Sequence, residues 1–247
     1  MNTLPCKLGI YLGTDSDHTL SLRELISSQF VDNKIPHTLA LTITLAPSVA
    51  IDIIDDLVDA HNIHDVNVIN HSIEFSLNRY CVLNYQLTFQ PAGKQQTNLH
   101  TNTIEKSLTV RLAGRNAQAT LMCSCHGTNE KIFTFKTLQD HQAANTKSNI
   151  IIKGVLDDQA QLLCTNMIQV AKAAHCTVAE QSNKNLLLSK TAKVITVPQL
   201  EIKNNNVACK HGAAISSIDK DHLFYLQSRG VEEETAKKMI IDGFLKI

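Results

Sequence analysis

Aromatic residues are scarce in this sequence and tryptophan is missing, since aromatic side chains make up only 4% of the 247 residues. A core must therefore come mainly from Leu, Ile, Val and Ala, which suits thin, regular layers. The shortage of rings disfavours sites that stack sugars or single-stranded nucleic acid on exposed aromatic side chains. The apolar fraction of 43% is nonetheless ordinary for a globular protein of one large domain or two small ones.

The chain also lacks an excess of charge of either sign, because 23 Lys and Arg balance 23 Asp and Glu. Without a basic surplus, nucleic acid is not expected as a partner. No apolar run approaches the length of a membrane span, and the first residues show no signal peptide. Seven cysteines, an odd number, do not form the dense spacing of a disulfide framework. We therefore expect a cytoplasmic protein with free thiols and no membrane contact.

A short unit recurs from about Leu39 onward: an apolar residue, a few turn-like or charged residues, a small residue and another apolar stretch. The copies are 45–50 (LAPSVA), 112–117 (LAGRNA), 156–160 (LDDQA), 188–192 (LSKTA) and, more loosely, 202–207 (IKNNNV). Short strands joined by similar tight corners are typical of stacked solenoid turns. A β-sandwich is the alternative that the strand spacing alone leaves open.

Helices are expected at both ends of this β region. Residues 20–30 can form one helical stretch with an apolar side. Near the C-terminus, Asp219 can cap a helix over KDHLFYLQSR, and Gly230 suits its end. The last segment carries three acidic residues in its first turn, which favours a second helix. Its apolar stripe at helical spacing would consist of Ala236, Ile240, Gly243, Phe244 and Ile247.

The segment from Asn185 to Phe244 contains NLLLSKTAKVITVPQLEIKNNNVACKHGAA and LFYLQSRGVEEETAKKMIIDGF. It resembles the SufB/SufD family of iron–sulfur cluster assembly proteins. Softer similarity reaches back to Leu39 through LTVRLAGRNAQATL and HQAANTKSNIIIKGVL. The resemblance implies a mainly β fold, a right-handed parallel β-helix with a small C-terminal α-helical domain. We then expect a short, partly helical segment at 1–38, the β-helix core at 39–217 and the helical domain at 218–247.

Two features make the resemblance SufD-like rather than SufB-like. Gly212 follows His211 where SufB-like chains carry a glutamate, and residues 181–185 hold no cysteine. The resemblance implies a non-catalytic scaffold that pairs with a SufB-like paralogue through the β-helix and docks a SufC-like ATPase through the C-terminal helices. A homodimer is the open alternative to that pairing. Relatives usually carry a longer N-terminal helical region than residues 1–40 provide.

The resemblance places His211 at the partner interface, where a transient iron–sulfur cluster shared with the partner would form. The isolated chain is expected to hold no cofactor, and flavin binding by the complex is left open. Cys209 shares a strand face with His211, so both could reach one ion, although a packed thiol is the preferred interpretation for Cys209. Lys210, between them, should point away.

The resemblance also implies an ATPase-docking face on the C-terminal helices, for which simple packing within the chain is the alternative. The residues of that face are Phe224, Tyr225, Leu226, Arg229 and Gly230.

Other candidate chemistry in the sequence is weaker. Cys123 and Cys125 share a face but lack a second ligand pair, so we expect core cysteines. His141 with residues 146–148 lacks the elbow and oxyanion turn of a hydrolase. The adjacent acids at 55–56 should diverge on a strand, which makes a poor acid–base pair. The functional alternatives are a self-associating metal-binding β-helix protein and, less favoured, a β-helix enzyme acting on polysaccharide.

Overall fold

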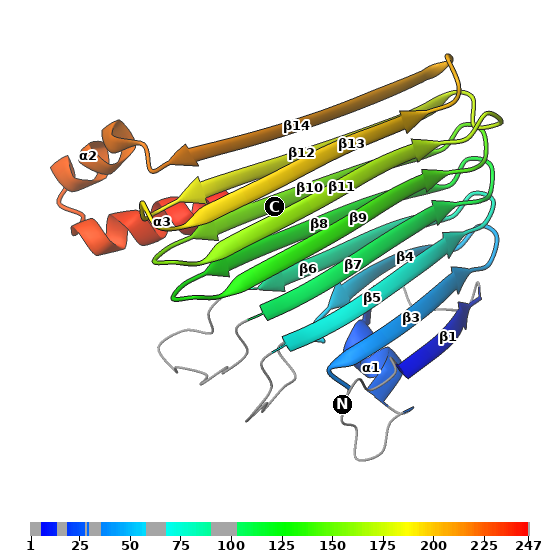
Figure 1. The fold of residues 1–247 in the computed structure, drawn as a ribbon, viewed down its shortest axis with the longest axis horizontal. Helices are drawn as coiled ribbons and strands as arrows, with labels where there is room; N and C mark the ends of the chain where they lie inside the picture. The colour runs from blue at the N-terminus through cyan, green and yellow to red at the C-terminus, as the bar shows by residue number, and fades with distance from the viewer. Residues whose placement is uncertain are drawn as a thin grey trace.

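The chain folds into a parallel β-solenoid of about six turns, followed by C-terminal helices (Figure 1). The computed structural model describes residues 6–13, 19–27, 29, 36–57, 68–89 and 103–246. This architecture confirms the mainly β, parallel fold expected from the recurring strand-and-corner unit, and the β-sandwich alternative is wrong.

Successive strands alternate between two parallel sheets, which are seven-stranded over the described residues. Sheet A contains β1 (Cys6–Leu12), β3 (Thr38–Leu45), β5 (Val68–Leu77), β7 (Thr103–Leu112), β9 (Ile132–His141), β11 (Gln161–Val170) and β13 (Lys193–Ile202). Sheet B contains β2 (Thr19–Ser21), β4 (Ala50–Asp55), β6 (Val82–Phe89), β8 (Gln118–Gly127), β10 (Lys147–Leu156), β12 (Thr177–Leu187) and β14 (Val207–Ser217). Each turn of the solenoid therefore adds one strand to each sheet.

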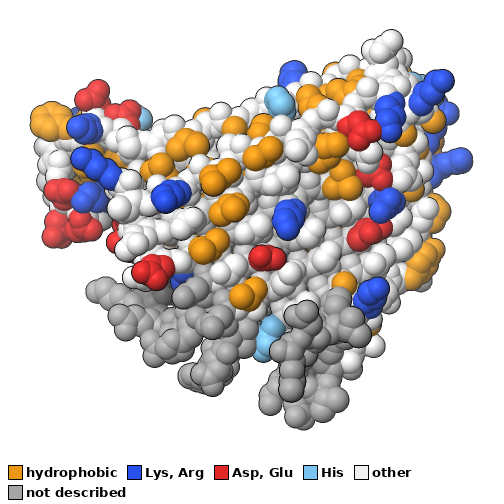
Figure 2. All heavy atoms as spheres, viewed as in Figure 1, with side chains coloured by type: hydrophobic (Ala, Val, Ile, Leu, Met, Phe, Trp, Pro, Cys, Tyr) orange, Lys and Arg blue, Asp and Glu red, His pale blue; other side chains and the backbone are white. Residues whose placement is uncertain are grey.

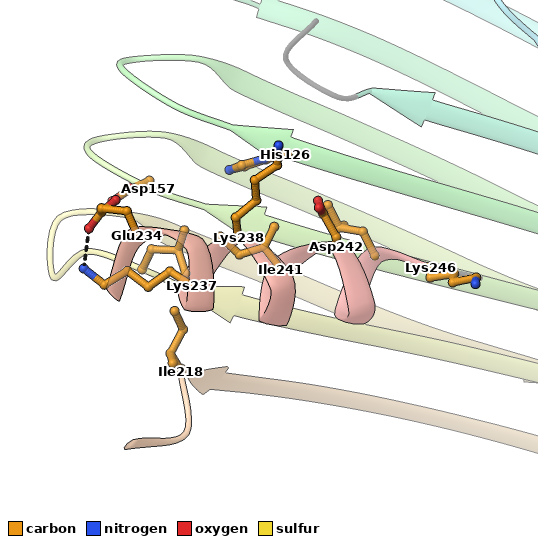
Figure 3. Close-up of a pocket in the computed structure, with 11 residues that line it drawn as sticks. His126, Asp157, Ile218, Glu234, Lys237, Lys238, Ile241, Asp242 and Lys246 are labelled. Atoms are coloured by element: carbon orange, nitrogen blue, oxygen red, sulfur yellow. Dashed lines mark hydrogen bonds and ion pairs between the residues drawn. The ribbon is translucent and has the colours of Figure 1, made fainter. Parts of the chain in front are cut away.

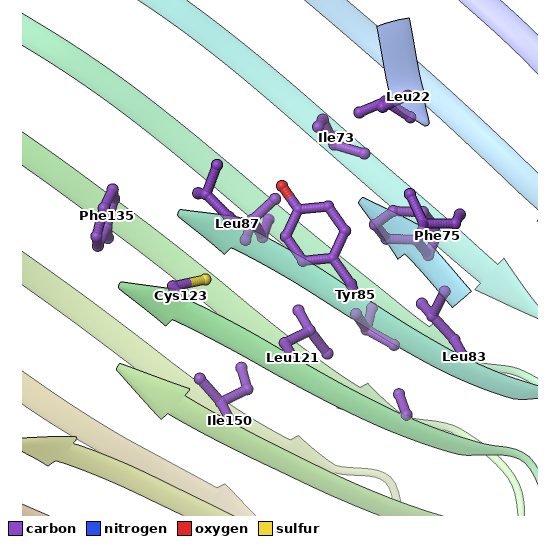
Figure 4. Packing of buried hydrophobic residues seen from close by; sticks show 14 of the residues in the cluster. Leu22, Ile73, Phe75, Leu83, Tyr85, Leu87, Leu121, Cys123, Phe135 and Ile150 are labelled. Carbon is purple, nitrogen blue, oxygen red and sulfur yellow. The ribbon is translucent and has the colours of Figure 1, made fainter. Parts of the chain in front are cut away.

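The core lies between the two sheets, because every second residue of a strand points inward. In β7 the buried and half-buried positions alternate along the whole strand. Tyr85, Leu121 and Ile150 stack from neighbouring strands of sheet B toward the other sheet (Figure 4). Phe75 meets Tyr85 edge to face, with ring centroids 5.5 Å apart. Burying one Leu or Ile side chain in this core stabilises the fold by about 1.5–3 kcal/mol.

The recurring sequence unit is the corner between strands, as predicted. Asn116 and Asp158 occupy these corners with φ of 64° and 51°, in the left-handed region that Asn and Asp tolerate. The small residues that follow, Ala117 and Ala160, are fully buried. At Gly114 a Cβ atom would lie 2.0 Å from the Arg79 backbone nitrogen, so only glycine lets these two turns approach.

The predicted helix at residues 20–30 is too long at its N-terminal end. β2 (Thr19–Ser21) occupies its start, and α1 extends only over Leu22–Ser27. Parallel pairing of β2 with β4 outweighs helix propensity there. Leu22 and Ile26 are buried as expected, while Phe30 lies outside the described residues. The boundary at residue 39 stays a prediction, and β1 and β2 precede it in the two sheets.

The C-terminal helices are α2 (Lys220–Ser228) and α3 (Glu233–Leu245). Asp219 caps α2 as predicted, accepting a hydrogen bond from the Asp221 backbone N–H at 2.8 Å. α3 packs its buried Ile241 and Leu245 against Val155 and Leu186 of sheet B. None of the helices in the described part of the chain is long and apolar enough to span a membrane.

The stripe predicted for α3 is partly wrong. Ala236 is buried and Phe244 packs at the edge of the cluster, but Ile240 is only half-buried and Gly243 is exposed. The contact with sheet B rotates the helix so that Ile241, rather than Ile240, points at the strands. Ile247 lies outside the described residues.

Candidate functional site at the open end of the solenoid

The last turn of the solenoid is uncovered. β13 and β14 are the outermost strands of their sheets, so each has one edge without a paired strand among the described residues (Figure 1). Their inward-facing residues Leu200, Ile202 and Ile215 are 39%, 41% and 48% exposed. We call this surface of β13 and β14 the open end.

His211 and Cys209 both lie on the inward face of the open end. In the register of β12 with β14, Gln181 pairs with His211 and Ala179 with Cys209. Gln181 and Ala179 are buried, so their partners face the same interior. His211 is exposed, because no further strand covers it in the described structure. The prediction that the two side chains share a face agrees with this register.

Cys209 is partly buried against the apolar cluster that contains Ile168 and Val170. Burial raises the pKa of the Cys209 thiol above its ordinary value, although a backbone hydrogen bond with Ala179 acts the other way. The thiol therefore stays protonated at neutral pH unless a metal ion displaces the proton. Lys210 points to the opposite face, where its Nζ lies 3.7 Å from Glu180 Oε1.

Behind His211 the interior is polar, which the sequence reasoning missed. Asn185 Nδ2 donates to Asn183 Oδ1 at 2.8 Å, and Asn183 Nδ2 donates to Thr196 Oγ1 at 3.0 Å. The signal was present in the sequence: Gln181, Asn183 and Asn185 are polar residues at every second position, all on the buried face of β12. Polar side chains there replace the aliphatic layer of the preceding turns.

The predicted docking residues lie on α2, which has no buried residue, and on the two positions that follow it. Phe224 is 71% exposed and Tyr225 57% exposed, while Leu226 is half-buried. Arg229 stacks on the Tyr225 ring at 5.3 Å. Gly230 ends the helix with φ of 83°. The apolar run therefore presents its rings to solvent, and packing within the described chain leaves them uncovered.

The outer face of sheet A carries a row of apolar side chains over its last strands (Figure 2). Ile195 and Val197 of β13 are 54% and 42% exposed. These side chains add to the apolar surface that the last turn exposes at the open end.

A groove of about 890 Å³ lies between α3 and the ends of β8 and β10 (Figure 3). His126, Asp157 and Asp242 line it. Burial lowers the pKa of His126, although both carboxylates act in the opposite direction. Across the described residues, no group of three or more His, Cys, Asp or Glu side chains could hold a metal ion.

The weaker candidates are core groups. Cys123 and Cys125 are buried inside β8, as predicted. Asp55 and Asp56 diverge, since Asp55 is buried while Asp56 Oδ2 accepts from the Ser21 hydroxyl at 2.6 Å. The structure places these groups apart from the open end.

The interior also holds two buried polar networks. One joins His141 to the residues at 146–148 that the sequence singled out, and the other was not predicted. His141 bonds Thr146 and Ser148 inside the solenoid, at 2.8 and 2.7 Å. Nearer the N-terminus, Lys106 Nζ lies 2.8 Å from Asp55 Oδ2. The Lys106–Asp55 pair joins strands 51 residues apart, so it leaves no local motif. The partners of His141 lie only five and seven residues away, at the next corner and the start of the following strand.

Comparison with known proteins finds sequence similarity over most of the described chain. The family model for the SufBD core domain of the SUF iron–sulfur cluster assembly system matches residues 65–244. A SufBD family protein of Synechocystis is 34% identical over 152 residues, which cover 57% of this chain and 33% of that protein. The SufD protein of Escherichia coli is 31% identical over 141 residues, with the same coverages.

A Staphylococcus saprophyticus SufBD family protein is 31% identical over 106 residues, which cover 43% of this chain and 23% of that protein. The matches span a third or less of the length of these relatives. The family match extends from β5 to the last turn of α3 and includes the whole open end. The chain therefore belongs to the SufBD family of iron–sulfur cluster assembly proteins.

Proposed function

We propose that this chain is a SufD-like, non-catalytic scaffold subunit of a cytoplasmic iron–sulfur cluster assembly complex. The observation that carries the proposal is the open end, where a long pair of unpaired strand edges exposes apolar inward-facing side chains. Such an edge is a template for pairing with another chain. A SufB-like paralogue would continue the two sheets and cover Leu200, Ile202 and Ile215. Free thiols suit the reducing cytoplasm.

The cluster is cargo in this proposal. His211 and Cys209 give this chain at most two ligands at the open end, and the SufB-like partner would supply the remaining thiol and carboxylate. The imidazole and thiolate suit iron as ligands. Flavin binding enters no step of the proposal.

The exposed rings of α2 support a second contact, with a SufC-like ATPase. Phe224 and Tyr225 project from a helix that buries nothing. Aromatic residues and arginine are enriched among residues that dominate binding energy. We therefore assign α2 as the ATPase-docking helix.

Co-purification tests the proposal. The chain is expressed with a SufB-like and a SufC-like protein, and the complex is isolated through a tag on this chain. Stoichiometric recovery of both partners is expected. Recovery of neither, when both are present and folded, would overturn the proposal. Recovery of the ATPase alone would reject pairing through the open end and leave α2 docking intact.

Self-association around a metal ion is the second candidate, favoured by the shared face of Cys209 and His211. Two copies could bring two such pairs together, which makes the four ligands of a tetrahedral site. Iron or zinc in the isolated protein, lost in His211→Ala, would support this function. Equal metal content in the two proteins would reject it.

A further inference from the structure

The interior behind the open end holds buried amide groups without hydrogen-bond partners. Gln181 is 4% exposed, and neither its amide nitrogen nor its amide oxygen is bonded among the described residues. Asn166 Nδ2 and Asn185 Oδ1 are buried and unpartnered as well. A buried amide group without a hydrogen bond costs about 1–3 kcal/mol of folding free energy. We therefore expect each of these groups to form a hydrogen bond with a nearby polar side chain.

Of the two residues paired with Gln181 on adjacent strands, only one is polar. On its N-terminal side the register pairs it with the aliphatic Ile150 of β10, and on the open side with His211. Paired residues on adjacent strands lie about 4.8 Å apart and point to the same face. The imidazole of His211 is therefore the polar side chain that lies in register beside the unpaired amide. Because His211 is exposed, its ring is free to turn toward Gln181.

We propose that Gln181 is a positioning residue for His211. One ring N–H of His211 donates a hydrogen bond to the Gln181 amide oxygen. This bond fixes which ring nitrogen carries the proton, and it turns the other ring nitrogen outward from the open end. Histidine ligands usually donate their second N–H to such an acceptor, which orients the ring and raises its basicity as a ligand. The inference rests on the proposed function for its purpose, because the outward nitrogen would meet the partner and its cluster.

The tautomer of His211 tests the inference in the isolated chain. Two-bond proton–nitrogen correlation spectra of protein labelled with 15N-histidine separate the two neutral tautomers, and His211→Ala identifies the signal. One tautomer is expected to dominate in the natural protein. Gln181→Met keeps the length of the side chain but removes the acceptor. It is expected to change the tautomer ratio roughly fivefold, the effect of one hydrogen bond.

Two variants separate positioning from general disruption of the core. Gln181→Glu keeps an acceptor oxygen and is expected to restore the single tautomer. Asn183→Leu breaks a hydrogen bond on the same face of β12 but is in register with Ala213, so it should leave the His211 signal unchanged. An unchanged tautomer ratio in folded Gln181→Met would overturn the inference, and so would an equal change in Asn183→Leu.

Failure of the inference and failure of the proposed function give different results. Capture of the SufB-like chain tests the function and is expected to persist in Gln181→Met. If the natural chain captures no SufB-like partner, the proposed function is rejected, and the tautomer ratio still tests the role of Gln181. If the chain captures the partner but the tautomer ratio is the same in Gln181→Met, only the inference about Gln181 is rejected.

Discussion

Lys106 is the residue whose environment departs furthest from the ordinary, since both it and Asp55 have fully buried side chains. The Lys106 ammonium lies 2.8 Å from Asp55 Oδ2 and 3.1 Å from His71 Nδ1, and Tyr85 donates its hydroxyl to the same carboxylate. Burial alone would raise the pKa of Asp55. The charge of Lys106 and the hydrogen bonds outweigh burial, so that pKa lies below its usual value.

Removing the cation should therefore destabilise the fold. Lys106→Met leaves the Asp55 carboxylate buried without its counterion, which costs about 3–5 kcal/mol of unfolding free energy. Urea unfolding at neutral pH measures the loss, and Lys136→Met on the exposed face of β9 is the matched control. Because the folded-state pKa of Asp55 is lowered, the stabilisation is present above the unfolded value of about 3.9 and fades as pH falls below it. Equal stability of the two variants would contradict this account.

His141 predicts a second pH dependence at the residue scale. Burial lowers the pKa of His141 to about 4, whereas an unfolded histidine titrates near pKa ~6.5. Below about pH 6.5 the unfolded state therefore binds the extra proton first, and stability falls as pH decreases toward 4. We expect a loss of about 2 kcal/mol between about pH 7.5 and about pH 5. His141→Asn should flatten this part of the unfolding profile, and an unaltered slope would reject the assignment.

At the scale of the element, α2 is expected to act by its surface alone. Phe224→Ala removes an exposed ring, so the unfolding free energy should change by less than about 0.5 kcal/mol. Affinity for the SufC-like ATPase should fall roughly 30-fold or more, as when a residue worth at least about 2 kcal/mol is truncated. Met239→Ala on α3, 51% exposed, is the control. Calorimetric titration of each variant with the ATPase measures these affinities. If Phe224→Ala binds the ATPase as the natural chain does, α2 is not part of the interface.

Elements were predictable where one local rule governs them. The corner units and the cap at Asp219 are local patterns, and both appear in the structure as expected. The start of α1 was not predictable, because pairing of β2 with β4 sets it. The buried face of α3 was not predictable either, because contact with sheet B sets it. The shared face of Cys209 and His211 followed from the alternation of faces along a strand. The interface role of His211 came from the family resemblance and stays a prediction. The role proposed for Gln181 needed the register between β12 and β14, which depends on the whole solenoid.

The two ends of the whole molecule differ in how they are closed. At the N-terminal end, α1 packs the fully buried Leu22 and Ile26 into the main core. At the C-terminal end, α2 and α3 lie to one side, and β14 stays uncovered (Figure 1). Solenoids need a cap at each end to keep their core from water. No described element covers β14, and in the proposed function another chain would complete the core there.

A charge at the open end should therefore block partner binding without harming the chain. Ile215→Lys places an ammonium on a side chain that is already 48% exposed, and Ile54→Lys does the same at 45% exposure on β4. In the complex the Ile215 position would lose water, so affinity for the SufB-like chain should fall at least about tenfold. Ile54→Lys should bind as the natural chain does. Sedimentation of the isolated proteins tests the other occupant, because a homodimer would exceed the monomer mass of 27.3 kDa and dissociate in Ile215→Lys only. If Ile215→Lys matches the natural chain in both measurements, the open end is not the interface.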